Sequence, residues 1–314
     1  MPRIVITEFM DDAAVASLHA SFDVLYDPRL VDDPSRLQAA VVDADALIVR
    51  NRTQVNPALL AHAPNLRVVG RLGVGLDNID VAACAARAIE VFPATGANAL
   101  AVAEYVIATA MLLLRGTYGA SADVAAGGWP RARLSAGREI NGKCLGLVGF
   151  GGIGRLTAGL ARALGMHVVA HDPQVAASDP AWTQHAATPL ALDALLASAD
   201  VVSLHVPLVA ATRNLFDAGR LARMKRDAVL INTSRGGIVD ERALAAALAA
   251  GQIAGAALDV FDAEPLAAGS PLAGAPNLLL TPHIAGVTAE SNQRVSSLIA
   301  QRVTEHLRLR ADAR

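Results

Sequence analysis

Three side chains in this sequence have the types needed for acid–base and carboxylate chemistry: Arg235, Glu264 and His283. Histidine exchanges a proton near neutral pH, and an adjacent carboxylate orients the imidazole and favours its protonated form. Glu264 is our candidate for that carboxylate. Arginine presents a planar fork of donors that pairs with a substrate carboxylate and polarises a neighbouring carbonyl oxygen, and Arg235 precedes two glycines that allow close approach. The alternative is a surface arginine, a turn glutamate and a histidine satisfied at a strand end.

A glycine-rich turn follows the apolar run 145–148 and opens a helical pattern. Gly149 would let the strand end turn tightly, Gly151 would let the backbone approach a pyrophosphate, and Gly154 would let helix and strand pack closely. The helix N-terminus, beginning near Gly152, offers free N–H groups and a positive dipole end to phosphates. The turn therefore predicts a dinucleotide site.

Asp172 closes the next predicted strand, roughly 18 residues beyond Gly154, where a dinucleotide-binding unit places the carboxylate for the adenosine ribose hydroxyls. A carboxylate there would repel the extra phosphate of NADP, so NAD is favoured. The alternative is that Asp172 only opens a turn before Pro173. With NAD as cofactor, the three candidate side chains fit hydride transfer to or from a hydroxyl or carbonyl carbon.

Short apolar runs alternate with helical stretches along the chain, a pattern typical of parallel sheets covered on both faces. The predicted strands are 4–6, 24–26, 46–49, 66–69 and 91–92, then 145–148, 167–172, 201–206, 228–232, 256–260 and 278–280. Ligand-binding residues in such sheets follow the carboxyl ends of strands, where the candidate residues fall. His205 falls there too, and it either lines the cofactor site or caps its strand.

Length and composition limit the number of domains and the classes of protein to which the chain can belong. A chain of 314 residues suggests two domains, and a nearly all-apolar helix predicted at 97–115 would link them. The irregular stretch 116–142 is predicted to protrude as an arm. The chain is 53% hydrophobic and 18% charged with a net charge of −2, which fits neither a disordered protein nor a nucleic-acid-binding surface.

The cysteines and the apolar segments indicate whether the protein binds a metal and where in the cell it is expected. Cys84 and Cys144 lie far apart, with no Cys-x-x-Cys pair or nearby histidine cluster, so we expect no metal site and no disulfide framework. The first residues do not resemble a signal peptide. The longest apolar stretch, 99–114, is interrupted by Glu104 and is too short to span a bilayer. We therefore expect a cytoplasmic protein with neither a membrane nor a nucleic-acid partner.

The assembled motifs resemble the NAD-dependent D-2-hydroxyacid dehydrogenase family of oxidoreductases, from about Arg50 almost to the C-terminus. The matching stretches are the glycine turn with Asp172 and the segments HVPL (205–208), NTSRGG (232–237), ALDVF (257–261), EPL (264–266) and TPH (281–283). The resemblance implies two doubly wound parallel-sheet α/β domains with the active site between them. Residues 1–98 plus 287–314 would form a flavodoxin-like substrate domain, and residues 99–286 a Rossmann NAD-binding domain.

The resemblance also implies roles for single residues. His283 would be the acid/base, Glu264 its partner and Arg235 the substrate-carboxylate binder. Asp259 would help to hold the nicotinamide carboxamide, and Arg155 would lie along the cofactor phosphates. The predicted cofactor-binding residues are Gly149, Gly151, Gly152, Ile153, Gly154, Arg155, Asp172, His205, Val206, Pro207, Thr233, Ser234, Asp259 and Gly286.

Two segments bear on the substrate. Loop 70–80 resembles the family's substrate loop, whose backbone N–H groups meet the carboxylate, and a plain strand-to-helix turn is the alternative. Segment 49–53 is most similar to the 3-phosphoglycerate dehydrogenase branch, and the glycine loop with Arg71 is similar to that of sulfolactate dehydrogenases. Both enzymes handle two anionic groups, so we hypothesise that Arg50 or Arg52 receives a second anion, unless one or both pair with local carboxylates. The predicted substrate-binding residues are Arg50, Asn51, Arg52, Leu72, Gly73, Val74 and Gly75.

Other readings of the resemblance stay open. A hydroxypyruvate or glyoxylate reductase is the alternative within the family. NAD-sensing transcriptional corepressors retain the same Arg, Glu and His but carry a long extra tail, and formate dehydrogenases carry an amide where Glu264 stands. Because the sequence stops at Arg314, we expect no added regulatory domain. The family commonly forms homodimers through the cofactor domain, so we expect the arm to embrace a partner, with Trp129, Arg131 or Arg133 as residues that could shape the neighbour's pocket.

Overall fold

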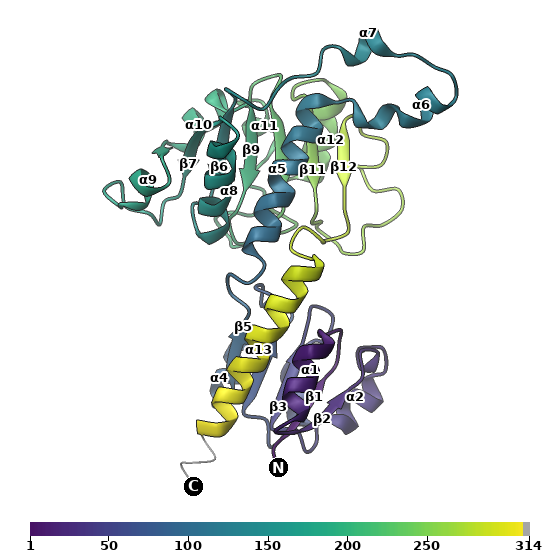
Figure 1. Ribbon diagram of the computed structural model, residues 1–314, viewed down its shortest axis with the longest axis vertical. Helices are drawn as coiled ribbons and strands as arrows, with labels where there is room; N and C mark the ends of the chain where they lie inside the picture. The colour runs from purple at the N-terminus through teal and green to yellow at the C-terminus, as the bar shows by residue number, and fades with distance from the viewer. Residues whose placement is uncertain (310–314) are drawn as a thin grey trace. The chain divides into compact units, whose positions relative to one another are not determined.

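The computed structural model describes residues 1–309 and divides into two compact units (Figure 1). Unit 1 comprises Met1–Asn98 and the chain from Val287 onward, and unit 2 comprises Ala99–Gly286. Unit 1 is therefore built from two separate stretches of sequence. Residues 310–314, which the predicted substrate domain includes, lie outside the described residues.

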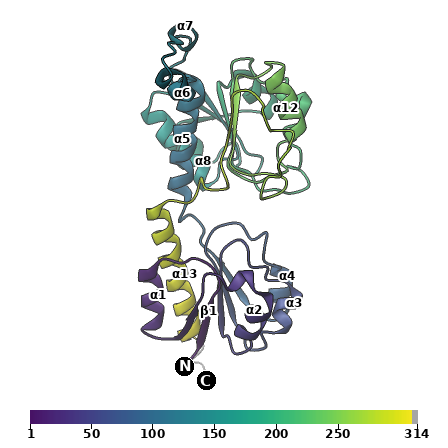
Figure 2. The same ribbon diagram turned by 90° about the vertical axis from the view of Figure 1, so that its right-hand side faces the viewer.

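Unit 1 is a five-stranded parallel sheet with the strand order β2-β1-β3-β4-β5, which is the flavodoxin-like order that the sequence predicted. Helices α1 and α13 cover one face of the sheet, and α2, α3 and α4 cover the other (Figure 2). Its elements are β1 (Arg3–Ile6), α1 (Asp12–His19), β2 (Asp23–Tyr26), η1 (Leu30–Asp32), α2 (Pro34–Ala40), β3 (Ala46–Val49), α3 (Pro57–Ala61), β4 (Val68–Arg71), α4 (Val81–Ala86), β5 (Glu90–Pro93) and α13 (Ala289–Leu309).

Short polar side chains fix where the helices of unit 1 begin. Asp11, Asp33, Asn56 and Asp80 each precede a helix and accept a hydrogen bond from a first-turn backbone N–H group. Such caps satisfy donors that the helix itself leaves unpaired. The loops that follow β1, β3 and β4 therefore end at defined residues, and those after β3 and β4 carry the predicted substrate-binding residues.

Unit 2 is a seven-stranded parallel sheet with the order β12-β11-β10-β9-β6-β7-β8. Counted from β6, this is the Rossmann order 3-2-1-4-5-6 with β12 added at one edge, so the predicted fold is confirmed. Its elements are α5 (Ala99–Arg115), β6 (Cys144–Val148), α8 (Gly152–Ala163), β7 (His167–His171), α9 (Ala181–Gln184), β8 (Ala187–Pro189), α10 (Leu192–Ser198), β9 (Val201–Leu204), α11 (Ala218–Leu221), β10 (Val229–Asn232), α12 (Glu241–Ala249), β11 (Gly255–Leu258) and β12 (Leu278–Leu280).

Two apolar layers hold the sheet of unit 2. Helices α5, α8 and α9 pack on one face, and α10, α11 and α12 pack on the other. Strands β9, β10 and β11 are buried along their whole length, which explains their continuous apolar sequences. Because all paired strands run parallel, their carboxyl ends lie at one edge of the sheet, and the loops that follow them meet there.

The arm predicted between α5 and β6 extends away from the sheet of unit 2 (Figure 1). It contains η2 (Tyr118–Ala120), α6 (Ser121–Ala125) and α7 (Arg131–Leu134). Its two ends are pinned together, since the Arg138 N–H group donates to the Leu114 carbonyl at 2.9 Å. Trp129 is 78% exposed.

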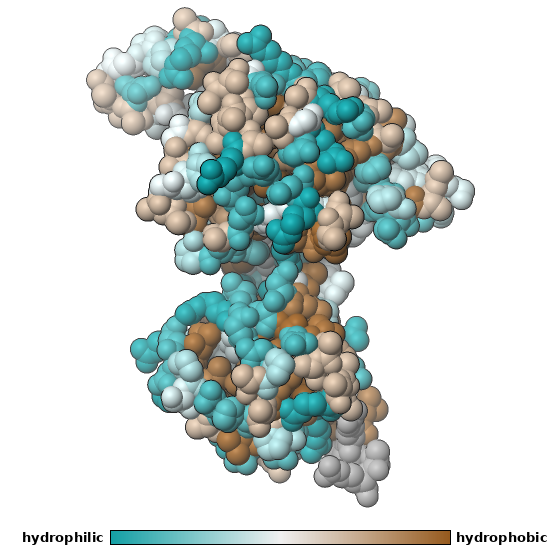
Figure 3. Space-filling model, turned by 180° about the vertical axis from the view of Figure 1, so that it is seen from behind, coloured by the Kyte–Doolittle hydropathy of each residue, from teal (hydrophilic) through white to brown (hydrophobic). Residues whose placement is uncertain are grey.

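The outer surface mixes polar and apolar groups. On the face in Figure 3, hydrophilic and hydrophobic atoms are interspersed over both units. Across residues 1–309, no helix combines the length and the apolar character needed to cross a membrane.

Candidate active site

The turn between β6 and α8 needs its glycines for two different reasons. Gly149 has a φ of +100°, and a Cβ atom on it would lie 2.3 Å from the His205 carbonyl oxygen. A Cβ atom on Gly154 would lie 2.5 Å from the Gly149 carbonyl oxygen. At Gly151 and Gly152, by contrast, a Cβ atom would meet no heavy atom of the described chain within 4 Å. The protein itself therefore requires the first pair, whereas the second pair leaves open space at the N-terminus of α8, which suits a phosphate group.

The carboxylate of Asp172 is fixed between two loops. Its Oδ1 atom accepts from the Gln174 N–H group at 2.9 Å, which is the local turn foreseen as the alternative role. Its Oδ2 atom accepts from the Phe150 N–H group at 2.8 Å, so the same carboxylate is also tied to the glycine turn. The Phe150 ring in turn stacks on Trp182, with ring centres 4.6 Å apart. Asp172 thus lies beside the turn at the end of β7.

Two basic side chains lie against this turn. The Nε–H group of Arg155 donates to the Phe150 carbonyl at 2.9 Å. His205 follows β9, and its Nε2 atom lies 3.0 Å from the Ser203 hydroxyl. Burial lowers the pKa of His205 to about 4, so its imidazole is neutral at physiological pH. Three further predicted residues complete this region: Ile153 in α8, and Val206 and Pro207 in the loop after β9.

The loop after β10 is braced by Asn232, which is 1% exposed. Its side chain accepts from the Ser234 N–H group and donates to the Arg235 carbonyl, both at 3.0 Å. The Ser234 hydroxyl donates to the Leu204 carbonyl at 2.5 Å. The hydroxyl oxygen of Thr233 is buried and has no hydrogen-bond partner within residues 1–309. A buried hydroxyl without a partner is costly, and a bound polar ligand would satisfy it.

The loop that carries Arg235 abuts the segment that carries Glu264. A Cβ atom on Gly236 would lie only 1.8 Å from the Phe261 carbonyl oxygen, so glycine alone permits this approach. The Phe261 N–H group donates to Glu264 Oε1 at 3.1 Å, and an Arg235 guanidinium N–H group donates to the Ser234 carbonyl at 2.6 Å. The structure thus brings Arg235 and Glu264 to the same edge of the sheet.

His283 and Glu264 form a pair. His283 Nδ1 lies 2.8 Å from Glu264 Oε2, and the two side chains are 44% and 35% exposed. An ionised carboxylate only accepts hydrogen bonds, so Nδ1 carries the hydrogen and Nε2 is the nitrogen that can exchange a proton. The backbone of His283 has a φ of +55°, an unfavourable conformation for a residue with a side chain. Its N–H group donates to the carbonyls of Asp259 at 2.8 Å and Thr281 at 3.0 Å, which stabilises it.

Asp259, which is 1% exposed, organises the turn around His283. Its Oδ1 atom accepts from the Thr281 hydroxyl at 2.6 Å and from the Ile284 N–H group at 2.8 Å. Its Oδ2 atom accepts from the Ala285 N–H group at 2.8 Å. The turn ends at Gly286, where unit 2 also ends. Asp259 therefore shapes the turn in addition to the role toward nicotinamide that the resemblance implies.

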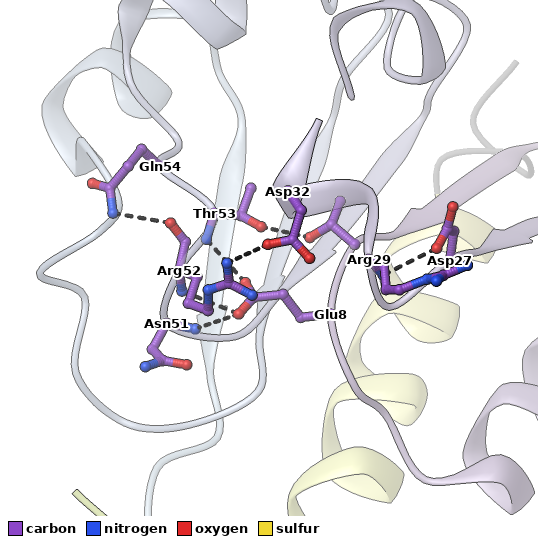
Figure 4. A network of polar contacts seen from close by, with 9 residues as sticks. Glu8, Asp27, Arg29, Asp32, Asn51, Arg52, Thr53 and Gln54 are labelled. Carbon is purple, nitrogen blue, oxygen red and sulfur yellow. Dashed lines mark hydrogen bonds and ion pairs between the residues drawn. The ribbon is translucent and has the colours of Figure 1, made fainter. Parts of the chain in front are cut away.

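In unit 1, a buried carboxylate that sequence reasoning missed holds the loop after β3. Glu8 is 4% exposed, and it accepts from four consecutive N–H groups, of which Figure 4 shows those of Asn51, Arg52 and Thr53. The donors and distances are Arg50 at 2.9 Å, Asn51 at 3.3 Å, Arg52 at 3.1 Å and Thr53 at 3.0 Å. These bonds use all four acceptor positions of the carboxylate. The sequence signal for it is only an acid two residues after an apolar strand.

Arg50 and Arg52 have different surroundings. The Arg52 guanidinium pairs with Asp32 (Figure 4), which is the local pairing foreseen as the alternative. The Arg50 guanidinium donates to the Asn292 side-chain oxygen at 2.8 Å and lies 5.8 Å from the centre of the Phe9 ring. Burial lowers the pKa of Arg50, and the charge of nearby Glu8 opposes this. Within residues 1–309, no carboxylate lies at ion-pair distance from Arg50.

In the glycine loop after β4, two backbone N–H groups are hydrogen-bonded and two are not. The Leu72 N–H group donates to a β3 carbonyl and the Gly73 N–H group to the Arg71 carbonyl, both at 2.8 Å. The Val74 and Gly75 N–H groups have no acceptor in the described chain. Arg71 folds over the loop, since its guanidinium lies 1.5 Å from where a Cβ atom on Gly73 would be. Of the four predicted residues, Val74 and Gly75 are thus the ones that offer N–H groups to a carboxylate.

A doubly wound sheet with a glycine turn, an acid at the end of its second strand and a His–Glu pair defines a dinucleotide-linked dehydrogenase. A model described as "D-isomer specific 2-hydroxyacid dehydrogenase, NAD binding domain" matches residues 107–285. The chain belongs to the D-isomer specific 2-hydroxyacid dehydrogenase family, and it is an NAD-linked D-2-hydroxyacid dehydrogenase.

Three similar proteins illustrate the branch. The (S)-sulfolactate dehydrogenase of Chromohalobacter salexigens is 55% identical over 99% of this chain and 100% of its own. The D-3-phosphoglycerate dehydrogenase of Mycobacterium leprae is 41% identical over 96% of this chain and 56% of its own, so the chain spans about half the length of that relative. The crystal structure of a glyoxylate reductase from Paecilomyes thermophila superimposes with a TM-score of 0.84 at 29% identity, covering 96% and 94% of the two chains. The predicted branch of the family is thereby confirmed.

The residues present fit NAD. Open space above Gly151 and Gly152 adjoins the N-terminus of α8, and the Thr233 hydroxyl lacks a partner within the described residues. At the end of β7 stands the carboxylate of Asp172 rather than a cation that would attract the NADP phosphate. When bound, the cofactor supplies the hydride acceptor or donor.

Proposed function

We propose that this enzyme interconverts a D-2-hydroxy acid that carries a second anionic group and the corresponding 2-oxo acid, with (S)-sulfolactate and 3-sulfopyruvate as the first pair to test. The observation that carries the proposal is the setting of Arg50. Its guanidinium is partly buried and held by the neutral partners Asn292 and Phe9, and the hydrogen bonds of Glu8 go to backbone N–H groups instead. A desolvated arginine without an ion-pair partner gains most from a bound anion.

The similarity to the Chromohalobacter enzyme supports sulfolactate because it extends over both whole chains. The descriptor (S) in its name agrees with D-isomer specificity. In the priority rules, a carbon bearing sulfur outranks the carboxyl carbon, so (S)-sulfolactate has the same arrangement around C2 as a D-2-hydroxy acid such as (R)-lactate. One geometry of hydride transfer therefore serves both.

Two other kinds of substrate remain candidates, one with two anionic groups and one with a single anionic group. The similarity to D-3-phosphoglycerate dehydrogenases favours 3-phosphoglycerate, which also carries two anionic groups. The likeness to a glyoxylate reductase favours glyoxylate or hydroxypyruvate, which carry only one. The distinguishing property is dependence on Arg50, because a substrate with one anionic group has nothing to place there.

The proposed chemistry assigns one task to each residue. His283 Nε2 donates the proton to the oxygen of the 2-oxo acid during reduction and accepts it during oxidation. Glu264 accepts a hydrogen bond from Nδ1 and so orients the imidazole. Arg235 pairs with the substrate carboxylate and polarises the neighbouring carbonyl. In unit 1, the N–H groups of Val74 and Gly75 are donors suited to a carboxylate.

The test is NADH consumption with four 2-oxo acids: 3-sulfopyruvate, phosphohydroxypyruvate, hydroxypyruvate and glyoxylate. We expect the highest kcat/KM with 3-sulfopyruvate. In the same assay, His283→Ala should lose turnover by a factor of about 10²–10⁴ while still binding NADH, as measured by fluorescence titration. Undiminished turnover in His283→Ala would remove the residue from the mechanism.

The second anion site has its own matched pair of variants. Arg50→Ala should raise the KM for 3-sulfopyruvate at least tenfold, since a charge-assisted contact contributes about 1.5–3 kcal/mol, and should leave the KM for glyoxylate within about twofold. Arg52→Ala, which removes an equal charge already paired with Asp32, should change either KM much less. Equal changes in the KM for both substrates in Arg50→Ala would refute the proposed second anion site.

The proposal extends to assembly and location. A homodimer in which the arm packs on the partner would cover Trp129, which is 78% exposed in a single chain. Light scattering should give the mass of a dimer, and Trp129→Ser should weaken the dimer. A monomeric wild type would contradict the proposed homodimer.

The proposed location is the cytoplasm. Cys84 and Cys144 are unpaired, which suits a reducing compartment. Cell fractionation that recovers the protein outside the cytoplasm would refute this location.

A further inference from the structure

Tyr105 lies behind the turn that carries His283, in helix α5 of the same unit. Its hydroxyl is 2.6 Å from the hydroxyl of Thr281, and the Thr281 hydroxyl donates to Asp259 Oδ1, also at 2.6 Å. Thr281 has one hydroxyl hydrogen, and Asp259 takes it. Tyr105 must therefore donate to Thr281, so the chain of hydrogen bonds has one direction and ends on a buried carboxylate.

The donor end of this chain is stable in its protonated form. Burial raises the pKa of Tyr105 and the negative charge of Asp259 adds to this rise, whereas the hydrogen bonds with Thr281 and Thr109 oppose it. A phenol with a raised pKa keeps its hydrogen over the whole physiological pH range. Tyr105 is thus a permanent donor in this position.

The acceptor end of the chain controls the backbone of the turn. Asp259 binds the N–H groups of Ile284 and Ala285 through its side chain and that of His283 through its carbonyl. The three bonded residues are consecutive, and the first of them has a left-handed backbone. Such a conformation persists only where its surroundings over-determine it, so the rotamer of Asp259 governs where the imidazole lies.

We propose that Tyr105 is a positioning residue for hydride transfer: through Thr281 it fixes the carboxylate of Asp259 and, with it, the turn that presents His283. The inference rests on the acid–base role proposed for His283. Tyr105 touches neither substrate nor reacting atoms and acts only through the other two side chains. Loss of its hydroxyl frees the Thr281 hydroxyl to rotate and loosens the turn, while the substrate-binding residues of unit 1 are unchanged.

The test is Tyr105→Phe, which keeps the ring and removes only the hydroxyl. We expect kcat for 2-oxo acid reduction to fall about three- to tenfold, the scale of one lost hydrogen bond, with KM for the 2-oxo acid within about twofold of wild type. The primary isotope effect with C4-deuterated NADH should rise, because a less well-placed proton donor makes the chemical step more rate-limiting. Tyr26→Phe removes a hydroxyl that bonds the Met10 carbonyl in unit 1 and should change neither quantity.

Two changes at Thr281 show whether the effect passes through this residue. Thr281→Val keeps the shape without the hydroxyl and should lower kcat at least as much as Tyr105→Phe, whereas Thr281→Ser keeps the hydroxyl and should retain most of the activity. The double variant with Tyr105→Phe and Thr281→Val should be no slower than Thr281→Val alone, because the two side chains act in series.

The outcomes separate this inference from the proposed function. If His283→Ala is inactive but Tyr105→Phe leaves kcat and the isotope effect unchanged, the positioning role is wrong and the catalytic assignment stands. Multiplicative losses in the double variant would also overturn it, since independent effects do not pass through one chain. If His283→Ala keeps full turnover, the proposed acid–base role fails and the role of Tyr105 fails with it.

Discussion

Replacing Glu8 by glutamine tests whether a buried carboxylate holds the loop of unit 1 that carries Arg50. The substitution keeps the shape of the side chain but converts one acceptor oxygen into a donor amide. Whichever way the amide turns, its nitrogen then faces two backbone N–H groups, either those of Asn51 and Arg52 or those of Arg50 and Thr53. Two donors lose their acceptor, and the remaining two face a neutral oxygen.

The cost follows from those bonds. A hydrogen bond to a charged group contributes about 1.5–3 kcal/mol, and the contacts at 3.1 and 3.3 Å belong at the lower end of that range. Glu8→Gln should therefore reduce the free energy of unfolding by about 3 kcal/mol, which corresponds to a fall in Tm of about 10 °C for a domain of this size. Because the loop carries Arg50, the KM for 3-sulfopyruvate should rise about tenfold and that for glyoxylate less than twofold.

Thermal unfolding and steady-state kinetics, run below the Tm of the variant, measure both effects. Glu90→Gln is the matched control, since Glu90 is exposed on β5 and the same loss of charge there should be nearly neutral. A Tm within about 2 °C of wild type would refute the stabilising role of the four hydrogen bonds. A loss of stability with unchanged KM values would show that the loop keeps Arg50 in place without Glu8.

Three further changes probe the cofactor-binding residues and the proposed second anion site. Asp172→Ala should weaken NADH binding about tenfold or more, the scale of a lost charge-assisted bond, and reduce discrimination against NADPH; an unchanged preference would remove Asp172 from cofactor selection. Because burial lowers the pKa of His205 to about 4, the unfolded chain takes up a proton below about pH 6.5 while the folded chain does not, so stability should fall by up to about 3 kcal/mol between pH 6.5 and 4. Urea unfolding of His205→Asn should lack that part of the slope. Asp32→Asn should change stability by less than about 1 kcal/mol, and a lower KM for 3-sulfopyruvate in it would show that Asp32 competes with substrate for Arg52.

Much of the site in unit 2 was predictable because its signals are local. The turn at Gly149 and Gly154 needs glycine for steric reasons that involve the next strand end, and any parallel sheet supplies that strand end. The acid after β7 and the histidine after β12 likewise occupy positions where such sheets gather ligand-binding residues. By contrast, β8 has only three residues with two of them exposed, too short a pattern for the sequence to reveal.

Which side chains form hydrogen bonds and ion pairs with one another was not predictable from the sequence. Glu8 lies some 42 residues before the loop that it holds, and Tyr105 is 176 residues from Thr281. Nothing in the spacing of these residues distinguishes them from ordinary polar side chains. Arg50 and Arg52 are nearly adjacent in sequence, yet one pairs with Asp32 and the other does not.

The sequence by itself therefore determined the fold class, the cofactor, the family and the identity of the acid–base candidates. These depend on the spacing of apolar residues, the placement of glycines and the residues at strand ends, which are all properties of short segments. The tertiary structure alone decided that Val74 and Gly75, rather than Leu72 and Gly73, keep their N–H groups for a ligand. It also decided that Arg50, unlike Arg52, has no ion-pair partner in the described chain. Hydrogen-bond partners and burial depend on which distant segments pack together, and packing is settled only when the whole chain has folded.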